Sequence, residues 1–123
     1  SYPITYSLNV MDKTSILYET PVANEFPVKD FNIIGVNGEV NDPNIIFELW
    51  TPAYNNDGSV TYTKIPGKSK IYPNGRFWVK FELNQPVNAF KIVVINNGVK
   101  VKNFYIKIYE IEVFKISTSK KKN

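Results

Sequence analysis

The 123-residue chain contains no cysteine and no histidine. The first absence excludes disulfide bonds, and the two together exclude the usual zinc-ligand sets. They also exclude Ser-His-Asp and Cys-His catalytic systems and any imidazole general base. Only carboxylates, Lys and Tyr are left for acid–base chemistry. We therefore expect a protein that is not an enzyme and that needs no cofactor.

Alanine is scarce as well, whereas Asn, Ile, Val, Tyr and Lys are frequent. This mixture favours strands over helices. The hydrophobic content of 43% is enough for a core, and the length suits one domain rather than two. No apolar run reaches the roughly 18 residues of a transmembrane helix, so we expect no membrane span.

The formal net charge of +4 is concentrated at the C-terminal end. Lys120, Lys121 and Lys122 contribute three of the charges, which leaves about +1 (4 − 3) on the rest of the chain. A short basic tail is usually solvated rather than bound to a partner. We therefore predict a single domain over residues 1–116, a basic disordered tail over 117–123 and no nucleic-acid partner.

The strongest strand signal is the alternation in RFWVKFEL, which begins at Arg76 and ends at Leu83. Apolar residues occupy every second position from Phe77 onward, which is the period of a strand with one buried face. Trp78 lies on the opposite, charged face. Its large ring there is either a binding platform or a structural residue that another segment covers.

Seven other stretches also have strand character, which gives eight strands in all. We expect strands over 4–9, 15–19, 28–36, 45–50, 60–65, 76–83, 89–95 and 104–114. Turns are expected at 37–38, 41–44, 84–86 and 96–98, with long loops over 51–59 and 66–75. Eight short strands without an amphipathic helix predict an all-β protein, an eight-stranded antiparallel β-sandwich of the jelly-roll type.

Several details of these strands are also predicted. Residues 45–50 are almost all apolar, which indicates a central strand buried on both faces, with Trp50 buried at its end. Gly35 indicates a bulge or a close backbone approach in its strand. The apolar phase slips between Ile108 and Ile111, and a bulge there, or burial on both faces, would account for the slip.

The order of motifs over residues 45–114 points to a known family. FELWTPAYNNDGSVTYTKI carries Asp57-Gly58, the strands FWVKFEL and FKIVVIN follow, and the segment closes on YEIEVF. This order resembles the galactose-binding-like jelly roll of the discoidin or coagulation-factor C-terminal type. The resemblance implies a jelly-roll fold and a module that binds glycans beside a hydrolase or on a cell surface. The family's N-terminal segment, which often contributes to a structural calcium site, has no counterpart in the first 40 residues, and we therefore assign no metal ligand.

Three groups of residues are candidates for a binding site. Trp78 could stack on the apolar face of a sugar ring. The second group comprises Tyr54, Asn55, Asn56 and Asp57, in which a ring and polar groups share a loop, although the same residues suit a tight turn. The third comprises Lys68, Lys70, Tyr72 and Arg76, which could receive an anionic group or could be ordinary solvated side chains.

Glu110 and Glu112 also share one strand face, about 6–7 Å apart. That separation could suit glycoside hydrolysis, but the pair belongs to a closing strand, and we interpret it as structural. We expect a non-catalytic carbohydrate-binding accessory module of a larger protein, located outside the cell or at its surface. The ligand-binding residues would be Trp78, Tyr54, Asn56, Asp57, Tyr72 and Arg76. The alternative is an assembly module of a surface, envelope or virion protein, with a protein partner or self-association through an apolar patch at Trp78.

Overall fold

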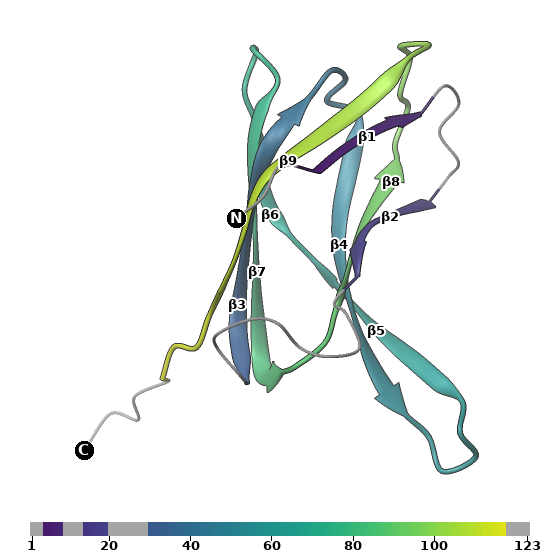
Figure 1. The fold of residues 1–123 in the computed structure, drawn as a ribbon, viewed down its shortest axis with the longest axis vertical. Coiled ribbons are helices and arrows are strands. Elements are labelled where there is room, and N and C mark those ends of the chain that lie inside the picture. Colours follow the sequence, from purple (N-terminus) through teal and green to yellow (C-terminus); the bar gives the residue numbers. More distant parts are fainter. Residues whose placement is uncertain (1–3, 9–13, 20–29, 118–123) are drawn as a thin grey trace.

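The computed structural model describes residues 4–8, 14–19 and 30–117, and only the backbone of the first two segments. Within these residues every regular element is a β-strand. The strands form two antiparallel sheets that face each other (Figure 1). The expected all-β architecture is confirmed, and its layers are arranged as in a β-sandwich.

One sheet contains five strands and the other contains four. The five-stranded sheet has the order β1 (Ile4–Leu8), β9 (Phe104–Phe114), β3 (Phe31–Val40), β7 (Arg76–Val87) and β6 (Lys68–Ile71). The four-stranded sheet has the order β2 (Thr14–Glu19), β8 (Lys91–Asn96), β4 (Ile45–Tyr54) and β5 (Val60–Pro66).

The predicted count of eight strands is wrong. Residues 30–117 alone supply seven strands, in sheets of four and three, and β1 and β2 add one edge strand to each sheet. The strand that the sequence did not indicate is β6, in the stretch 66–75 that was expected to be a loop. Its polar sequence KSKI has no apolar pattern, and it becomes a strand because it pairs with the edge of β7.

A single core fills the space between the sheets. Phe47 of β4 meets Phe77 of β7 with ring centroids 4.9 Å apart, and Phe31 of β3 meets Phe90 edge-on at 5.5 Å. The first pair joins one sheet to the other, and the second joins β3 to the connection that leads into β8. Because a fully buried aromatic side chain stabilises a fold by roughly 1.5–3 kcal/mol, these rings are major contributors to the packing.

Two predictions about individual strands are confirmed. In β7 the residues Phe77, Val79 and Phe81 are buried while the positions between them are exposed. In β9 the register with β3 shifts where Asn37 and Gly38 face Glu110 and Ile108, which leaves Tyr109 as the extra residue of a bulge. The bulge explains why the buried face of β9 changes phase along the strand.

The turn expected at Asn37-Gly38 is wrong, because both residues lie inside β3. Gly38 faces inward, and a Cβ there would collide with the carbonyl oxygen of Lys107. The glycine therefore permits close packing against the bulged strand rather than a chain reversal. Gly35 was expected to mark a bulge or a close backbone approach, but the register with β9 shifts between Asn37 and Gly38 instead, and a Cβ at Gly35 would have no atom within 4 Å.

Four further expectations are corrected. β4 alternates instead of being buried on both faces, since Ile46 is 43% exposed between two buried neighbours. Trp50 faces outward and is only partly covered. The expected loop over 51–59 is mostly the hairpin of β4 and β5, and the expected turn at 84–86 lies within β7. Pairing with β5 extends residues 51–54 into the sheet, whereas residues 84–86 lie where the register between β3 and β7 shifts.

The turn between β3 and β4 contains a buried carboxylate that no sequence pattern had indicated. Asp42 is only 4% exposed. Its Oδ1 accepts hydrogen bonds from the backbone and side-chain amides of Asn44, and its Oδ2 accepts from the backbone of Lys100 at 2.7 Å and Val101 at 3.2 Å. Burial acts to raise the pKa of Asp42, but these donors outweigh it and the pKa is lowered.

The end of the described chain is tied to β3. The backbone N–H of Ile116 donates to Oδ1 of Asn32, and the side-chain amide of Asn32 donates back to the carbonyl of Ile116. Residues 118–123, which include the three consecutive lysines of the predicted tail, lie outside the described residues. The predicted boundary at residue 116 remains a prediction.

Candidate functional site: the outer face of the five-stranded sheet

The outer face of the five-stranded sheet brings together side chains from four strands. Residues that pair across β9, β3, β7 and β6 form rows on this face, which we name after their member in β7. The Arg76 row contains Lys107, Glu39 and Arg76; the Trp78 row contains Glu110, Asn37, Trp78 and Lys70; the Lys80 row contains Glu112, Gly35, Lys80 and Lys68; the Glu82 row contains Phe114, Ile33 and Glu82.

Trp78 lies near the middle of this face and is 40% exposed. Within the part of the chain that the structure describes, its ring takes part in no hydrogen bond, ring contact or cation contact. The predicted alternative, a ring covered by another segment, does not hold for the described residues. The exposed indole therefore offers a flat apolar surface beside polar neighbours.

Next to Trp78 the central strand leaves space. Gly35 faces outward, and a Cβ added there would have no atom within 4 Å. Asn37, the next outward residue of β3, is small and donates from its side-chain amide to Oε1 of Glu110 at 3.2 Å. A low strip along β3 thus separates Trp78 and Lys80 on one side from Glu110 and Glu112 on the other. Glycine inside a strand often marks such a place of close approach by a ligand or another backbone.

The Arg76 row at one end of the strip is held by contacts within the protein. The hydroxyl groups of Tyr109 and Tyr105 donate to the Glu39 carboxylate at 2.8 and 3.1 Å, and the Arg76 guanidinium lies 4.8 Å from the Tyr109 ring centre. The hydrogen bond from Tyr109 and then that from Tyr105 lower the pKa of Glu39, and the same bonds raise the pKa of both tyrosines. This cluster fixes the position of Arg76 beside the strip.

The lysines around Trp78 are also engaged. The Lys70 ammonium lies 5.1 Å from the Tyr72 ring centre, and the Lys80 ammonium forms an ion pair with Glu82 at 3.3 Å. Both contacts are exposed and therefore weak, so either lysine can turn toward a ligand at little cost.

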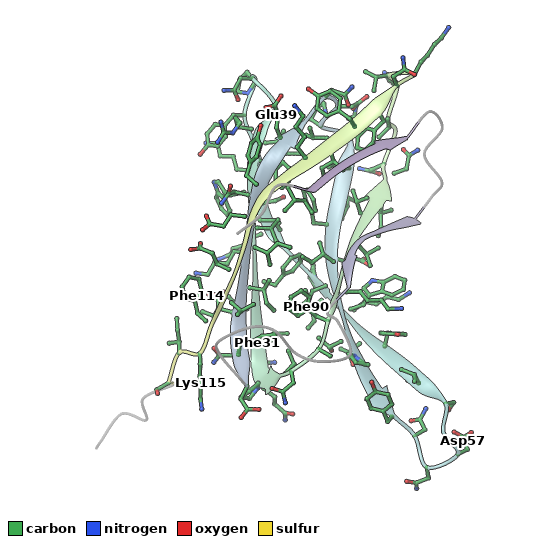
Figure 2. All side chains as sticks on the ribbon, viewed as in Figure 1. Phe31, Glu39, Asp57, Phe90, Phe114 and Lys115 are labelled. Carbon is green, nitrogen blue, oxygen red and sulfur yellow. The ribbon has the colours of Figure 1, made fainter. Side chains whose placement is uncertain are left out.

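The structure separates the six residues that the sequence proposed for ligand binding. Tyr72, Arg76 and Trp78 lie together on the five-stranded sheet and the turn before β7. Tyr54, Asn56 and Asp57 lie at the tip of the hairpin of β4 and β5, which projects away from the sandwich (Figure 1). Figure 2 labels Asp57 at this tip and Glu39 at the opposite end of the molecule.

The polar side chains at the hairpin tip serve the turn itself. Asp57 accepts from the backbone N–H of Ser59 at 2.9 Å and from its hydroxyl at 2.6 Å, and these bonds lower the pKa of Asp57. Asn55 donates to the side-chain oxygens of Ser59 and Thr61. Tyr54 is 77% exposed and stands without a partner ring among the described residues. The turn interpretation therefore accounts for Asn55 and Asp57.

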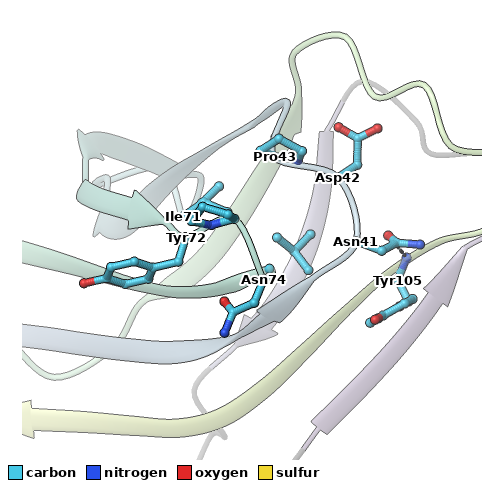
Figure 3. Close-up of a pocket in the computed structure, with 10 residues that line it drawn as sticks. Asn41, Asp42, Pro43, Ile71, Tyr72, Asn74 and Tyr105 are labelled. Atoms are coloured by element: carbon cyan, nitrogen blue, oxygen red, sulfur yellow. Dashed lines mark hydrogen bonds between the residues drawn. The ribbon is translucent and has the colours of Figure 1, made fainter.

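A cleft of about 450 Å³ lies between the turn that follows β3 and the turn that precedes β7 (Figure 3). Tyr72, Asn74 and Tyr105 contribute to its walls. Its polar groups are largely engaged, because Asn41 bonds to the backbone of Asn103 and Tyr105 and all four Asp42 bonds are internal. Few groups remain to recognise a ligand, so we place the candidate site on the sheet face rather than in this cleft.

The second tryptophan lies on the outer face of the other sheet. The Nε1–H of Trp50 donates to Glu48 at 2.9 Å, its ring lies 5.9 Å from that of Tyr62, and the Lys64 ammonium is 4.4 Å from its centre. Its surface is thus occupied by the protein's own side chains. Trp50 is not a candidate for ligand stacking.

Sequence reasoning missed Asn37 and Glu39 and treated Glu110 as structural. Asn37-Gly38 resembles a turn, and Glu39 gains significance only because β9 carries two tyrosines to it. The shared outward face of Glu110 and Glu112 was predicted correctly.

Among the described residues no group of three or more acidic side chains is placed to hold a metal ion, and no helix is long and apolar enough to cross a membrane. No protein-family model, no curated protein and no solved structure matches the chain.

Proposed function

We propose that the protein is a non-catalytic carbohydrate-binding module of a larger extracellular or cell-surface protein. The observation that carries this proposal is the exposed ring of Trp78 beside the low strip at Gly35. Sugars present flat C–H faces that pack on an indole, and they present hydroxyl groups that need donors and acceptors. An aromatic surface next to a few convergent polar groups supplies both.

The polar groups beside Trp78 have complementary roles. The Asn37 amide and the Arg76 guanidinium are donors for sugar hydroxyl groups, and the Glu110 carboxylate is an acceptor for them. Tyr72, which is also exposed, extends the aromatic surface toward the edge of the sheet. Because the face is open and shallow, we expect weak affinity for one sugar unit and stronger binding of a chain or of several linked modules.

We further propose that the sandwich is a jelly roll of the galactose-binding-like type. Without the short edge strand β6, the sheet orders are β1-β9-β3-β7 and β2-β8-β4-β5. Every connection between successive strands then crosses from one sheet to the other except the hairpin of β4 and β5, which is the connectivity of a jelly roll. This order supports the resemblance over residues 45–114. The proposal makes glycan binding a reasonable expectation, although a fold alone does not determine function.

Titration with a panel of soluble glycans, followed by tryptophan fluorescence, tests the function. The Trp50→Phe variant should be the reference protein, because its emission comes from Trp78 alone. We expect one class of glycan to change this emission with saturation. In Trp78→Ala, isothermal calorimetry should show at least a roughly tenfold loss of affinity for the same glycan.

Tyr54→Ala is the matched control, since it removes an exposed aromatic ring at the far hairpin tip. Its affinity should equal that of the unmodified protein. If no glycan binds, or if Trp78→Ala binds as well as Tyr54→Ala, the proposal of a glycan site at Trp78 is wrong.

A further inference from the structure

The outer face of the five-stranded sheet has an uneven distribution of charge. In the Trp78 and Lys80 rows, the side formed by β6 and β7 carries Lys68, Lys70 and Lys80. The opposite side, formed by β9, carries Glu110 and Glu112. Between them, β3 contributes only Asn37 and the open position at Gly35. The face is therefore basic and aromatic on one side, acidic on the other and low in the middle.

Such a face is complementary to a second copy of itself. A twofold axis parallel to β3 would place the β7 side of one copy over the β9 side of the other, without changing the rows. Lys80 would then face Glu112 of the second copy, Trp78 would face Glu110, and each pair would occur twice. In the Glu82 row the exposed Phe114 would be covered. Isologous contacts of this kind are the commonest in symmetric dimers.

The low strip allows the two faces to approach. At Gly35 no side chain stands above the sheet, so Gly35 of each copy faces Gly35 of the other across the axis and no side chain there holds the flanking Lys80–Glu112 pairs apart. The contact ends at the Arg76 row, where like charges would meet. There Arg76 and Lys107 are held on the tyrosine rings of their own chain, at 4.8 and 5.5 Å.

From the charge complementarity and the open position at Gly35 we infer that this face pairs with a second copy of the same chain to form a twofold dimer. The three rows on β9, β3 and β7, which are the strands that overlap about this axis, cover about 14 by 20 Å, or roughly 600 Å² for both copies together. This area is below that of standard stable interfaces, so the dimer is weak and reversible, with a dissociation constant in the high micromolar range or above.

The dimer covers Trp78 and thus competes with glycan for the same face. This second part of the inference rests on the proposed function, whereas the dimer itself does not. A saturating glycan should shift the protein toward monomers, and dimerisation should lower the apparent glycan affinity as protein concentration rises.

Sedimentation velocity of the full chain over roughly 10 μM to 1 mM tests the dimer. We expect the sedimentation coefficient to rise with concentration at low salt and the rise to diminish at high salt. Lys80→Glu and Glu112→Lys should each weaken dimerisation by at least about tenfold, because each places two like-charged pairs in the interface. The double variant exchanges both partners and should restore dimerisation to within about threefold of the original protein.

Gly35→Gln is a second, independent test. It fills the low strip, and because its Cβ would have no atom within 4 Å and the rest of the side chain extends outward, the monomer should fold normally. Circular dichroism confirms the fold, and we expect this variant to remain monomeric at 1 mM or so. A protein that stays monomeric at this concentration, or a double charge variant without restored dimerisation, overturns the inference. Glycan titration at low protein concentration reports on the proposed function separately, since it does not require the dimer.

Discussion

The two tryptophans occupy equivalent places on opposite sheets, and their surroundings differ. Trp50 has its indole N–H bonded to Glu48 and a lysine over its ring, so the protein satisfies both its polar and its aromatic surface. Among the described residues, Trp78 has no hydrogen-bond partner for its indole N–H and no lysine over its ring. The outward-facing Gly35 lies in the adjacent row of the neighbouring strand β3. Exposure alone therefore does not identify a ring that binds a ligand. A tryptophan becomes a candidate when its own fold leaves the ring surface unoccupied.

The largest effect on stability is expected from replacing a glycine of β3 that faces the core rather than one that faces solvent. Gly38→Ala should destabilise the fold by about 3 kcal/mol or more, because the new methyl group meets the Lys107 carbonyl and the Phe77 ring. Gly35→Ala, three residues earlier on the outer face, should be neutral or stabilise by about 0.5 kcal/mol. Urea denaturation of both variants measures the difference in their stability. Equal losses of stability would contradict the distinction between the filled inner face and the open outer face.

The two sheets are linked by Asp42, whose carboxylate joins the turn after β3 to the chain between β8 and β9. Asp42→Asn should destabilise the protein at pH 7 by about 2 kcal/mol, since an amide cannot accept all four bonds. Because the folded pKa of Asp42 is lowered, its stabilising effect is complete above the ordinary pKa of Asp and is lost as the pH falls through the folded value.

The stability difference between Asp42→Asn and the unmodified protein should therefore shrink below about pH 4. Thermal denaturation followed by circular dichroism from pH 7 to pH 2.5 or so measures this change. A difference that stays constant over the whole range would show that the charge of Asp42 does not stabilise the fold.

Replacing each tryptophan separately by alanine tests the difference between the two outer faces. Trp50→Ala should cost about 1–2 kcal/mol of stability through lost contacts with Lys64 and Tyr62 and should leave glycan affinity unchanged. Trp78→Ala should change stability by less than about 1 kcal/mol and reduce glycan binding. Denaturation and calorimetry on the same samples measure both quantities, and the reverse assignment of effects would contradict the distinction between the faces.

The smallest effect is expected at the hairpin tip. Tyr54→Ala removes the most exposed large hydrophobic side chain of the described residues and should change the free energy of unfolding by less than about 0.5 kcal/mol. Urea denaturation provides the measurement. A larger loss would mean that the projecting hairpin packs against something that the described residues do not include.

The sequence predicted several elements well because their signals are local. Alternation in β7 indicated which side chains enter the core, and the slip of phase in β9 indicated the bulge at Tyr109. The outward position of Trp78 followed from the same alternation. The absence of Cys and His set limits on chemistry without any knowledge of the fold.

Other elements depended on partners distant in the chain. Asn37-Gly38 has the composition of a turn, but Gly38 is required where Lys107 approaches β3 from about 70 residues away in sequence. The polar stretches at 51–54 and 68–71 lack a strand pattern and became strands by pairing with neighbours. Likewise, the outward position of Trp50 depends on alternation within a segment that is apolar at almost every position.

The candidate site was predicted in part. Tyr72, Arg76 and Trp78 are neighbours because β6 pairs with β7, whereas Tyr54, Asn56 and Asp57 project from the other end of the molecule. The sequence by itself determined the all-β class, the buried face of β7 and the outward direction of Trp78, since side-chain period is a local property. The tertiary structure alone decided which side chains surround that ring, because strand pairing joins segments that have no relation along the chain.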